Sequence, residues 1–476
     1  MAATTIIQRP LFNVLPAGQP IIFTVINSSV VENTLFTRVK YVAEVYVSRE
    51  LVPNMSNNDS LIGTFKTTPN DAGVGIFDIR PIVENYVSTD NKALKHSQFK
   101  GAYNKYLDVP MHLIDHYSIT SNSFVYFSVR FKMEYSYDDS INLQTNYEVD
   151  SADFKLFNGY LKYTDPLVNA INEPVSFGFN SDVFKFVDTE GKFLTNAPIE
   201  QYANLDDYGT LAFNTSMVDL YDDGGTGGLR DIKISFINAA GGLIAYEQRS
   251  FVEEVDGGFF FTERAEAGNQ IVYVGVFPAN LRNWSDNFNN NIDIIDHCIV
   301  HAISWNNSVS SVASQSYKIN INCPTLKGYE PIRLTWLNQW GAWDYYTFNM
   351  KSTKSISTKG STYNQSEGTW NEAAYRIQGF KGGKKTFRVN STEKVTMNTG
   401  FVSEAESEWF EELINSPEIY ILEGFKTDVN FSILNDYVTP VRLATSSHTR
   451  KTVANDKLIQ YTFEVEKSKT LRTQSI

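Results

Sequence analysis

The sequence is poor in cysteine, and it lacks the long apolar runs of membrane-spanning proteins. Its two cysteines, Cys298 and Cys323, are too few for a disulfide framework, and whether they form a single bridge stays open. No stretch of about 18 apolar residues is present, so we expect no transmembrane helix and no membrane insertion. The first ten residues lack the basic region and apolar run of a signal peptide, which predicts a soluble protein made in a cytoplasm.

Positive charge is also scarce. The chain has 41 Lys and Arg residues against 54 Asp and Glu residues, which gives a net charge of −13. A surface of this sign repels phosphates, so we expect no direct contact with nucleic acid. Basic residues gather in three short stretches, at 351–359, 381–385 and 467–472. Such stretches are usually solvated loops and tails, and the alternative is a charge-complementary contact with a partner.

Motifs for catalysis or metal binding are missing as well. Histidines pair at His112 and His116 and again at His297 and His301, but the second pair lies in a predicted strand. A strand would separate those two positions by about 13 Å, too far for one zinc ion. The glycine-rich run at 222–228 lacks the Lys-Ser/Thr ending of a phosphate-binding loop. We therefore predict no catalytic, cofactor-binding or metal site and no enzyme, although facing carboxylates of a glycoside hydrolase depend on spatial spacing and stay open.

Residues that favour strands and turns are abundant instead. The chain has 26 Tyr and 32 Phe residues and many Asn, Ser and Thr residues, which predicts a mainly β fold. Residues 41–47 and 124–133 alternate as strands do. One face of the second strand is apolar, from Val125 to Met133, and we expect the face with Ser128, Arg130 and Lys132 to be wet. A strand ending at Phe77 leads into a short helical turn with Asp78 as its N-cap and Pro81 in its first turn.

The middle of the chain continues this pattern. Strands are predicted at 232–237, 242–246, 271–277 and 298–305, with turns at 222–228 and 239–242. Gly75-Ile-Phe77 followed by Asn85-Tyr86 is echoed by Gly275-Val-Phe277 followed by Asn283-Trp284. We therefore expect tandem β-sandwich domains at 1–155 and 156–325, the second either a diverged repeat of the first or alike by chance.

The last third, residues 326–476, combines strands with a helix. Ser403 and Glu406 fit a capping box, and the apolar residues after them fall on one stripe that ends before Pro417. Strands are predicted at 418–422 and 458–466, and a hairpin turn at 381–384 is predicted to join strands at 374–380 and 386–389. These features predict a smaller α+β domain with one flanking helix, so that the whole chain is mainly β.

Residues 333–348 are the richest in aromatic side chains, with six of them in sixteen positions: Trp336, Trp340, Trp343, Tyr345, Tyr346 and Phe348. Core packing of a strand–turn–strand uses such residues. Subunit interfaces also concentrate them, and so do platforms on which sugars stack. The residues alone leave these three interpretations open.

Three segments in this order, 41–47, 75–86 and 333–348, resemble a family of virion structural proteins from tailed phages of Bacteroidetes hosts, including crAss-like phages. In that family the last segment typically reads as a Trp-Leu-Asn run, a glycine, and then Asp-Tyr-Tyr/Phe-Thr-Phe. Trp340 and Ala342 are local variations of it here. The resemblance covers patches of residues 20–350, and the last third is similar to tail-associated β modules with one flanking helix.

The resemblance implies a structural protein of the virion, in a ring, hub or baseplate of the tail, which acts by oligomeric assembly without a cofactor. Its partners would be other copies of itself, closing into a ring by heterologous contacts, and other virion proteins. Exposed strand edges and the loops at 215–230 and 351–370 are the expected contact regions. The candidate interface residues are Trp336, Trp340, Trp343, Tyr345, Tyr346, Lys351, Lys354 and Lys359. The alternative is a tail-tip receptor-binding or carbohydrate-binding adhesin, in which exposed tryptophans line a groove for a cell-surface glycan.

Overall fold

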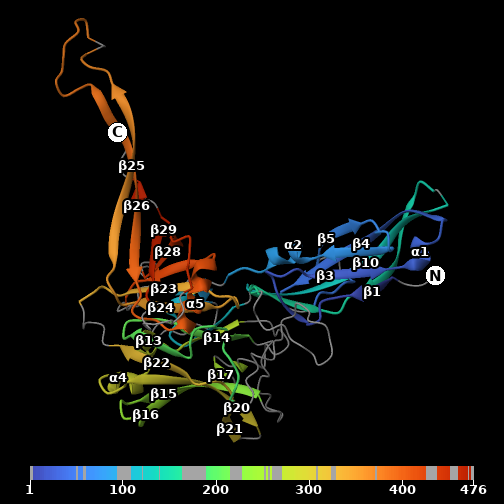
Figure 1. Cartoon of the computed structure of the whole chain (residues 1–476), viewed down its shortest axis with the longest axis horizontal. Helices are drawn as coiled ribbons and strands as arrows, with labels where there is room; N and C mark the ends of the chain where they lie inside the picture. Colours follow the sequence, from blue (N-terminus) through green and yellow to red (C-terminus); the bar gives the residue numbers. More distant parts are fainter. Residues whose placement is uncertain are drawn as a thin grey trace. The chain divides into compact units, whose positions relative to one another are not determined.

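The computed structural model describes most of the chain, and its described part is mainly β, as predicted (Figure 1). The described residues are 4–49, 52–56, 60–89, 91–93, 109–120, 122–138, 140–162, 189–214, 228–250, 254–255, 258–259, 271–306, 309–322, 328–369, 372–424, 437–450, 459–469 and 471–472. They divide into two compact units, the first formed by residues 1–321 with 337–344 and the second by residues 322–336 with 345–476.

The first sandwich of unit 1 pairs a three-stranded sheet with a six-stranded one. The smaller sheet has the order β1-β3-β6, with β1 (Thr5–Gln8), β3 (Ile22–Ile26) and β6 (Val74–Asp78). The larger sheet has the order β2-β12-β10-β4-β5, and β11 also pairs with β10. Its strands are β2 (Val14–Pro16), β4 (Phe36–Ser48), β5 (Leu61–Thr67), β10 (Phe124–Tyr137), β11 (Leu143–Asp150) and β12 (Phe154–Phe157).

The core of this sandwich forms because alternate residues of facing strands are large and apolar. All five predicted inward residues of β10, from Val125 to Met133, are fully buried. Phe131 on β10 packs against Phe23 on β3, with ring centroids 5.5 Å apart. Helix α1 (Ser28–Val31) contributes the buried Val30. The strand alternation read from the sequence is therefore confirmed for this face.

The turn predicted after Phe77 is present with a small shift. Helix α2 (Arg80–Val83) has Pro81 at its start and continues into η2 (Glu84–Tyr86). The N-cap position is Ile79 rather than Asp78, but the Asp78 carboxylate accepts a hydrogen bond from the backbone N–H of Arg80 at 3.1 Å. The carboxylate thus satisfies one of the free N–H groups of the first turn, which is the purpose of a cap.

The second sandwich of unit 1 also pairs a three-stranded sheet with a six-stranded one. The smaller sheet has the order β14-β19-β9, with β14 (Thr210–Asn214), β19 (Ile271–Gly275) and β9 (Tyr117–Thr120). The larger sheet has the order β13-β22-β20-β15-β16, and β21 also pairs with β20. Its strands are β13 (Glu200–Asn204), β15 (Gly228–Ile237), β16 (Leu243–Ser250), β20 (His297–Asn306), β21 (Val309–Val312) and β22 (Tyr317–Asn322).

The two sandwiches share one strand order. The path β2-β12-β10-β4-β5 becomes β13-β22-β20-β15-β16, and β11 corresponds to β21. In the smaller sheets, the antiparallel pair β3–β6 corresponds to β14–β19. After β19 the chain enters α3 (Pro278–Arg282), as β6 leads to α2, so the sequence echo falls on equivalent elements. Common ancestry of the two sandwiches stays a prediction, which this shared order supports.

One strand crosses the predicted boundary between the sandwiches. Strand β9 lies before β10 in the chain, yet it pairs with β19 of the second sandwich, and Tyr117 belongs to that sandwich's core. The two-unit division does not separate residues 155 and 156, so this boundary stays a prediction. The remaining small elements of unit 1 are β7 (Lys92–Ala93), β8 (Val109–Pro110), η3 (Met111–Leu113), β17 (Glu254–Val255), β18 (Gly258–Phe259) and α4 (Asp286–Asn290).

Unit 2 is one eight-stranded sheet with a helix, in the order β24-β23-β27-β28-β29-β26-β25, and β30 also pairs with β26. The predicted capping box is present: the Ser403 side chain and Glu406 begin helix α5 (Glu404–Asn415), which ends before Pro417. The strands are β23 (Ile332–Leu337), β24 (Trp343–Phe348), β25 (Thr353–Gln365), β26 (Gly383–Asn398), β27 (Ile419–Leu422), β28 (Val438–Leu443), β29 (Thr462–Lys467) and β30 (Leu471–Arg472).

Two predictions for unit 2 are wrong. Residues 353–365 form strand β25 instead of lying in a loop at 351–370, and their partner is β26. Residues 374–380 are not a strand, so the predicted hairpin at 381–384 is replaced by a longer one between β25 and β26. A strand exposed on both faces needs no apolar alternation, and for that reason the sequence pattern did not reveal β25.

Candidate functional site

The aromatic segment 333–348 is a hairpin whose two strands belong largely to unit 2. Trp336 on β23 is fully buried, and its ring centroid lies 4.8 Å from that of Trp409 on helix α5. Tyr346 on β24 makes an edge contact with Phe410 of the same helix, at 4.9 Å between centroids. Burial raises the pKa of the Tyr346 hydroxyl above its ordinary value. These residues form the apolar layer between the sheet and the helix of unit 2.

The turn of this hairpin is built around the buried Asn338. Its side-chain oxygen accepts hydrogen bonds from the backbone N–H groups of Trp340 and Ala342, each at 3.0 Å. Its side-chain nitrogen donates to the carbonyl oxygen of Leu194 at 2.8 Å and to the Asp344 carboxylate at 3.0 Å. Gly341 has a φ of 76°, and a Cβ there would lie 2.2 Å from the carbonyl oxygen of Asn158. The Trp-Leu-Asn run and the glycine therefore specify a tight, packed turn.

The turn residues 337–344 belong to unit 1 and are held there by polar contacts. Trp340 donates its indole N–H to Asn196 at 3.0 Å, and Asp344 accepts from the Thr195 hydroxyl at 2.7 Å. Trp343 makes an edge contact with His112 at 4.6 Å between centroids. Burial lowers the pKa of His112 to about 3, so this histidine is neutral at pH 7.

The candidate interface residues thus separate into two groups. Trp336, Trp340, Trp343 and Tyr345 are buried within the chain and Tyr346 is nearly so, which favours core packing over an interface for the aromatic group. A reading based on exposed tryptophans, as in the adhesin alternative, conflicts with the burial of the three tryptophans. The lysines at 351, 354 and 359 are exposed, and they begin a different element.

That element is a long hairpin, which we call the arm and define as residues 351–398. Strand β25 pairs with β26 along its whole length, from Thr353 with Thr396 to Gln365 with Gly383, with one β-bulge on β26. Figure 1 shows the hairpin, in orange, extending beyond the other strands of its sheet. Of the described strands, β29 pairs with residues 394–398 and β30 with residues 390–391. Six of the seven residues 383–389 pair with β25 alone and Phe387 is bulged, which makes a projection of about 23 Å at the usual strand rise.

The arm is exposed on both faces. The first ten residues of β25 are all exposed, and so are most of residues 383–388 on β26. Large apolar side chains are exposed as well, including Ile356 at 70%, Ile377 at 80% and Phe380 at 75%. A two-stranded hairpin is marginally stable by itself in water, so such an element gains from a partner that covers it.

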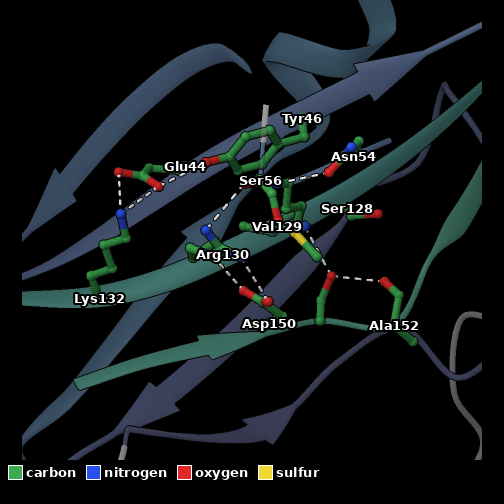
Figure 2. A network of polar contacts seen from close by, with 12 residues as sticks. Glu44, Tyr46, Asn54, Ser56, Ser128, Val129, Arg130, Lys132, Asp150 and Ala152 are labelled. Atoms are coloured by element: carbon green, nitrogen blue, oxygen red, sulfur yellow. Dashed lines mark hydrogen bonds and ion pairs between the residues drawn. The ribbon is translucent and has the colours of Figure 1, made fainter. Parts of the chain in front are cut away.

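A polar network lies on the larger sheet of the first sandwich, on the face of β10 that was expected to be wet (Figure 2). Arg130 on β10 donates two hydrogen bonds to the Asp150 carboxylate on β11, at 2.7 and 3.0 Å, and a third to the Met55 carbonyl oxygen at 3.2 Å. Lys132 donates to Glu44 on β4 at 2.9 Å. The Asp150 carboxylate raises the pKa of the Arg130 guanidinium.

This network corrects the expectation of a wet face. Ser128 is fully buried, and Arg130 and Lys132 are only partly exposed because the ion pairs hold their heads against the sheet. Arg130 lies directly across from Glu44 and Asp150 in the strand register, and Lys132 reaches the Glu44 carboxylate diagonally. Cross-strand pairs of this kind stabilise a sheet, so we interpret the network as structural.

The histidines and the cysteine that were considered as metal ligands do not form a cluster among the described residues. His297 and His301 lie on β20 and bind Asp296 at 2.8 Å and Ser316 at 2.7 Å, respectively. Among the described residues, no group of three or more His, Cys, Asp or Glu side chains is arranged to hold a metal ion. Cys298 is a buried free thiol, and burial raises its pKa to about 12. Cys323 and residues 215–227, which include most of the predicted loop at 215–230, lie outside the described residues.

The candidate interface residues named from the sequence left out Lys384, Lys385 and Arg388 on β26. The basic run at 381–385 was a visible signal, but only the pairing of β25 with β26 places these residues beside Lys359. None of the described helices is long and apolar enough to span a membrane. No protein-family model matches the chain, and no curated protein sequence matches it either.

Proposed function

We propose that this protein is a structural subunit of a tailed-phage virion, in a ring, hub or baseplate of the tail, and that it acts by oligomeric assembly. The observation that carries the proposal is the exposed arm, because a projecting two-stranded hairpin is suited to reach a neighbouring subunit. The resemblance of residues 41–47, 75–86 and 333–348 to virion proteins supports the same function. No catalytic step is part of this proposal.

Exposed strand edges supply further contact sites for assembly. Strands β5 and β16 end the larger sheets of the two sandwiches, and β25 ends the sheet of unit 2. The free N–H and C=O groups of an edge strand are templates for pairing with another chain. Heterologous contacts between identical subunits close into a ring when the rotation between them divides a full turn.

The test is the mass of the purified protein in solution over a concentration series, followed by sedimentation with particles assembled from the other virion proteins. We expect a defined oligomer, or a monomer that sediments with the particles. A protein that stays monomeric and never sediments with particles would refute the assembly function. Binding to a glycan array by such a monomer would support the adhesin alternative.

A further inference from the structure

The charge of the arm is opposite to that of the rest of the chain. Residues 351–398 contain nine Lys and Arg residues and three Glu residues, a net charge of +6. The whole chain carries −13, so the remaining residues carry −19. An acidic protein that carries a net positive charge on an exposed hairpin has two complementary surfaces in one molecule.

The strand register gathers the positive charge on one face of the arm. Residues that pair across an antiparallel ladder point to the same face, and the face alternates along each strand. A β-bulge at Phe387 shifts this alternation on β26, so that Lys385 and Arg388 share a face although they are three residues apart. Ser361 pairs with Arg388, and Tyr363 pairs with Lys385. Lys359 lies two residues before Ser361 and therefore shares this face. The described strand segments 357–365 and 383–390 contain no acidic residue that would neutralise these charges.

We propose that the arm of one copy of this protein docks against the acidic surface of a second copy. This inference rests on the proposed assembly function and names the partner of the arm. The basic face of Lys359, Lys385 and Arg388 contacts acidic side chains, while the half-exposed Phe387, whose ring packs against Tyr363 on the same face, loses contact with water. The contact is heterologous, because it joins the arm of one copy to a different surface of the next.

Charge also argues against the simplest competing contact, in which two arms pair with each other. Such a contact would bring two segments of +6 together, and like charges across an interface are unfavourable. Nucleic acid is the other acidic polymer to consider. The −19 of the remaining chain would repel the phosphates of a long nucleic acid, whereas it attracts the arm of another copy.

The experiment is sedimentation velocity of the full-length protein, comparing wild type with the triple variant Lys359→Glu, Lys385→Glu and Arg388→Glu. A matched control, Arg9→Glu, Lys40→Glu and Lys192→Glu, makes the same change of net charge at exposed positions outside the arm. We expect the arm variant to weaken self-association by at least about tenfold and the control to change it far less. Self-association of wild type should also weaken as salt is raised, because screening shortens the range of these charges.

A mixing experiment separates an arm-to-body contact from an arm-to-arm contact. The arm variant keeps the acidic acceptor surface, so it should still bind the arm of a wild-type copy and shorten wild-type oligomers when added in excess. Failure of the arm variant to bind wild type would overturn the proposal, and so would unchanged self-association of the arm variant. In the second case the oligomer itself persists, so the proposed assembly function would stand without this role of the arm.

A third measurement addresses nucleic acid directly. Wild-type protein is titrated with a fluorescent double-stranded DNA fragment at physiological salt, and we expect no saturable binding. A wild-type protein that remains monomeric but binds DNA through Lys359, Lys385 and Arg388 would overturn the proposal.

Discussion

The aromatic segment 333–348 and the arm 351–398 are close neighbours in the chain, yet the first is buried and the second is exposed. The first packs five large aromatic residues inside the protein, and the second exposes most of its side chains on both faces. The aromatic segment and a loop predicted at 351–370 were expected to contact partners. The difference teaches that aromatic residues in a region of low charge pack into the chain's own core. An exposed two-stranded hairpin, by contrast, gains stability when a partner covers it.

The contrast also separates two kinds of stability. Contacts of the aromatic segment are made within one chain, so they contribute at any protein concentration. Contacts of the arm with a second copy form only by association, so their contribution rises with concentration. Mutations in the two regions should therefore affect different measurements.

Removal of a core aromatic residue should have the largest effect. Trp336→Ala deletes a fully buried ring that packs on Trp409, which should cost about 3–5 kcal/mol of unfolding free energy. The measurement is urea unfolding followed by circular dichroism. The matched arm variant, Phe387→Ala, alters a side chain that is 45% exposed and should cost far less. Equal effects of the two variants would contradict the contrast between the regions.

Loss of the Asn338 side chain, at the centre of the turn, should have the second-largest effect on stability. Asn338→Ala removes four hydrogen bonds to the turn and to unit 1, which should cost about 2–3 kcal/mol because buried polar partners are left unsatisfied. Asn364→Ala in the exposed part of the arm is the control, and it should be nearly neutral. Both are measured by thermal unfolding, and a neutral Asn338→Ala would show that the turn is not held as described.

Acid should weaken the aromatic segment through His112, while the arm contains no histidine. Burial lowers the pKa of His112 from 6.5 to about 3, so below pH 6.5 the unfolded chain binds a proton that the folded chain does not. Stability from neutral His112 is complete above pH 6.5 and declines as the pH falls towards 3. Between pH 6.5 and pH 5 the loss should be about 2 kcal/mol.

The check is the unfolding free energy at several pH values for wild type and for His112→Phe, which cannot titrate. The variant should show a smaller loss of stability on acidification, whatever its stability at neutral pH. An unchanged pH profile in His112→Phe would mean that another group causes the acid sensitivity.

The smallest effect on stability should come from the charges of the arm. The triple variant Lys359→Glu, Lys385→Glu and Arg388→Glu changes side chains on a projecting hairpin, so the unfolding free energy at high dilution should stay within about 0.5 kcal/mol of wild type per substitution. The measurement is thermal unfolding at the lowest usable concentration. A large loss there would indicate that the arm is stabilised by contacts within its own chain.

Local patterns predicted much of the fold. The alternation in residues 124–133 predicted β10 and its buried face, because side-chain direction in a strand depends on sequence position alone. The capping box at Ser403 and Glu406 predicted the start of helix α5, because its hydrogen bonds join residues three positions apart. The lysines at 351, 354 and 359 are exposed, and their role as interface residues stays a prediction.

These local patterns could not predict which distant strands pair with each other. The sequence contained no signal that β9 would join the second sandwich, since its partner β19 lies about 150 residues away. The register that places Arg388 and Lys385 on the face of Lys359 depends on a hairpin whose connection spans residues 366–382.

The sequence by itself determined the mainly β class, the strands with one apolar face and the position of the long helix, because these follow from the period of a few neighbouring residues. Only the tertiary structure decided that Trp336, Trp340 and Trp343 are core and that residues 353–365 form an exposed strand. Burial and strand pairing depend on which distant segments meet, and composition carries no information about that choice.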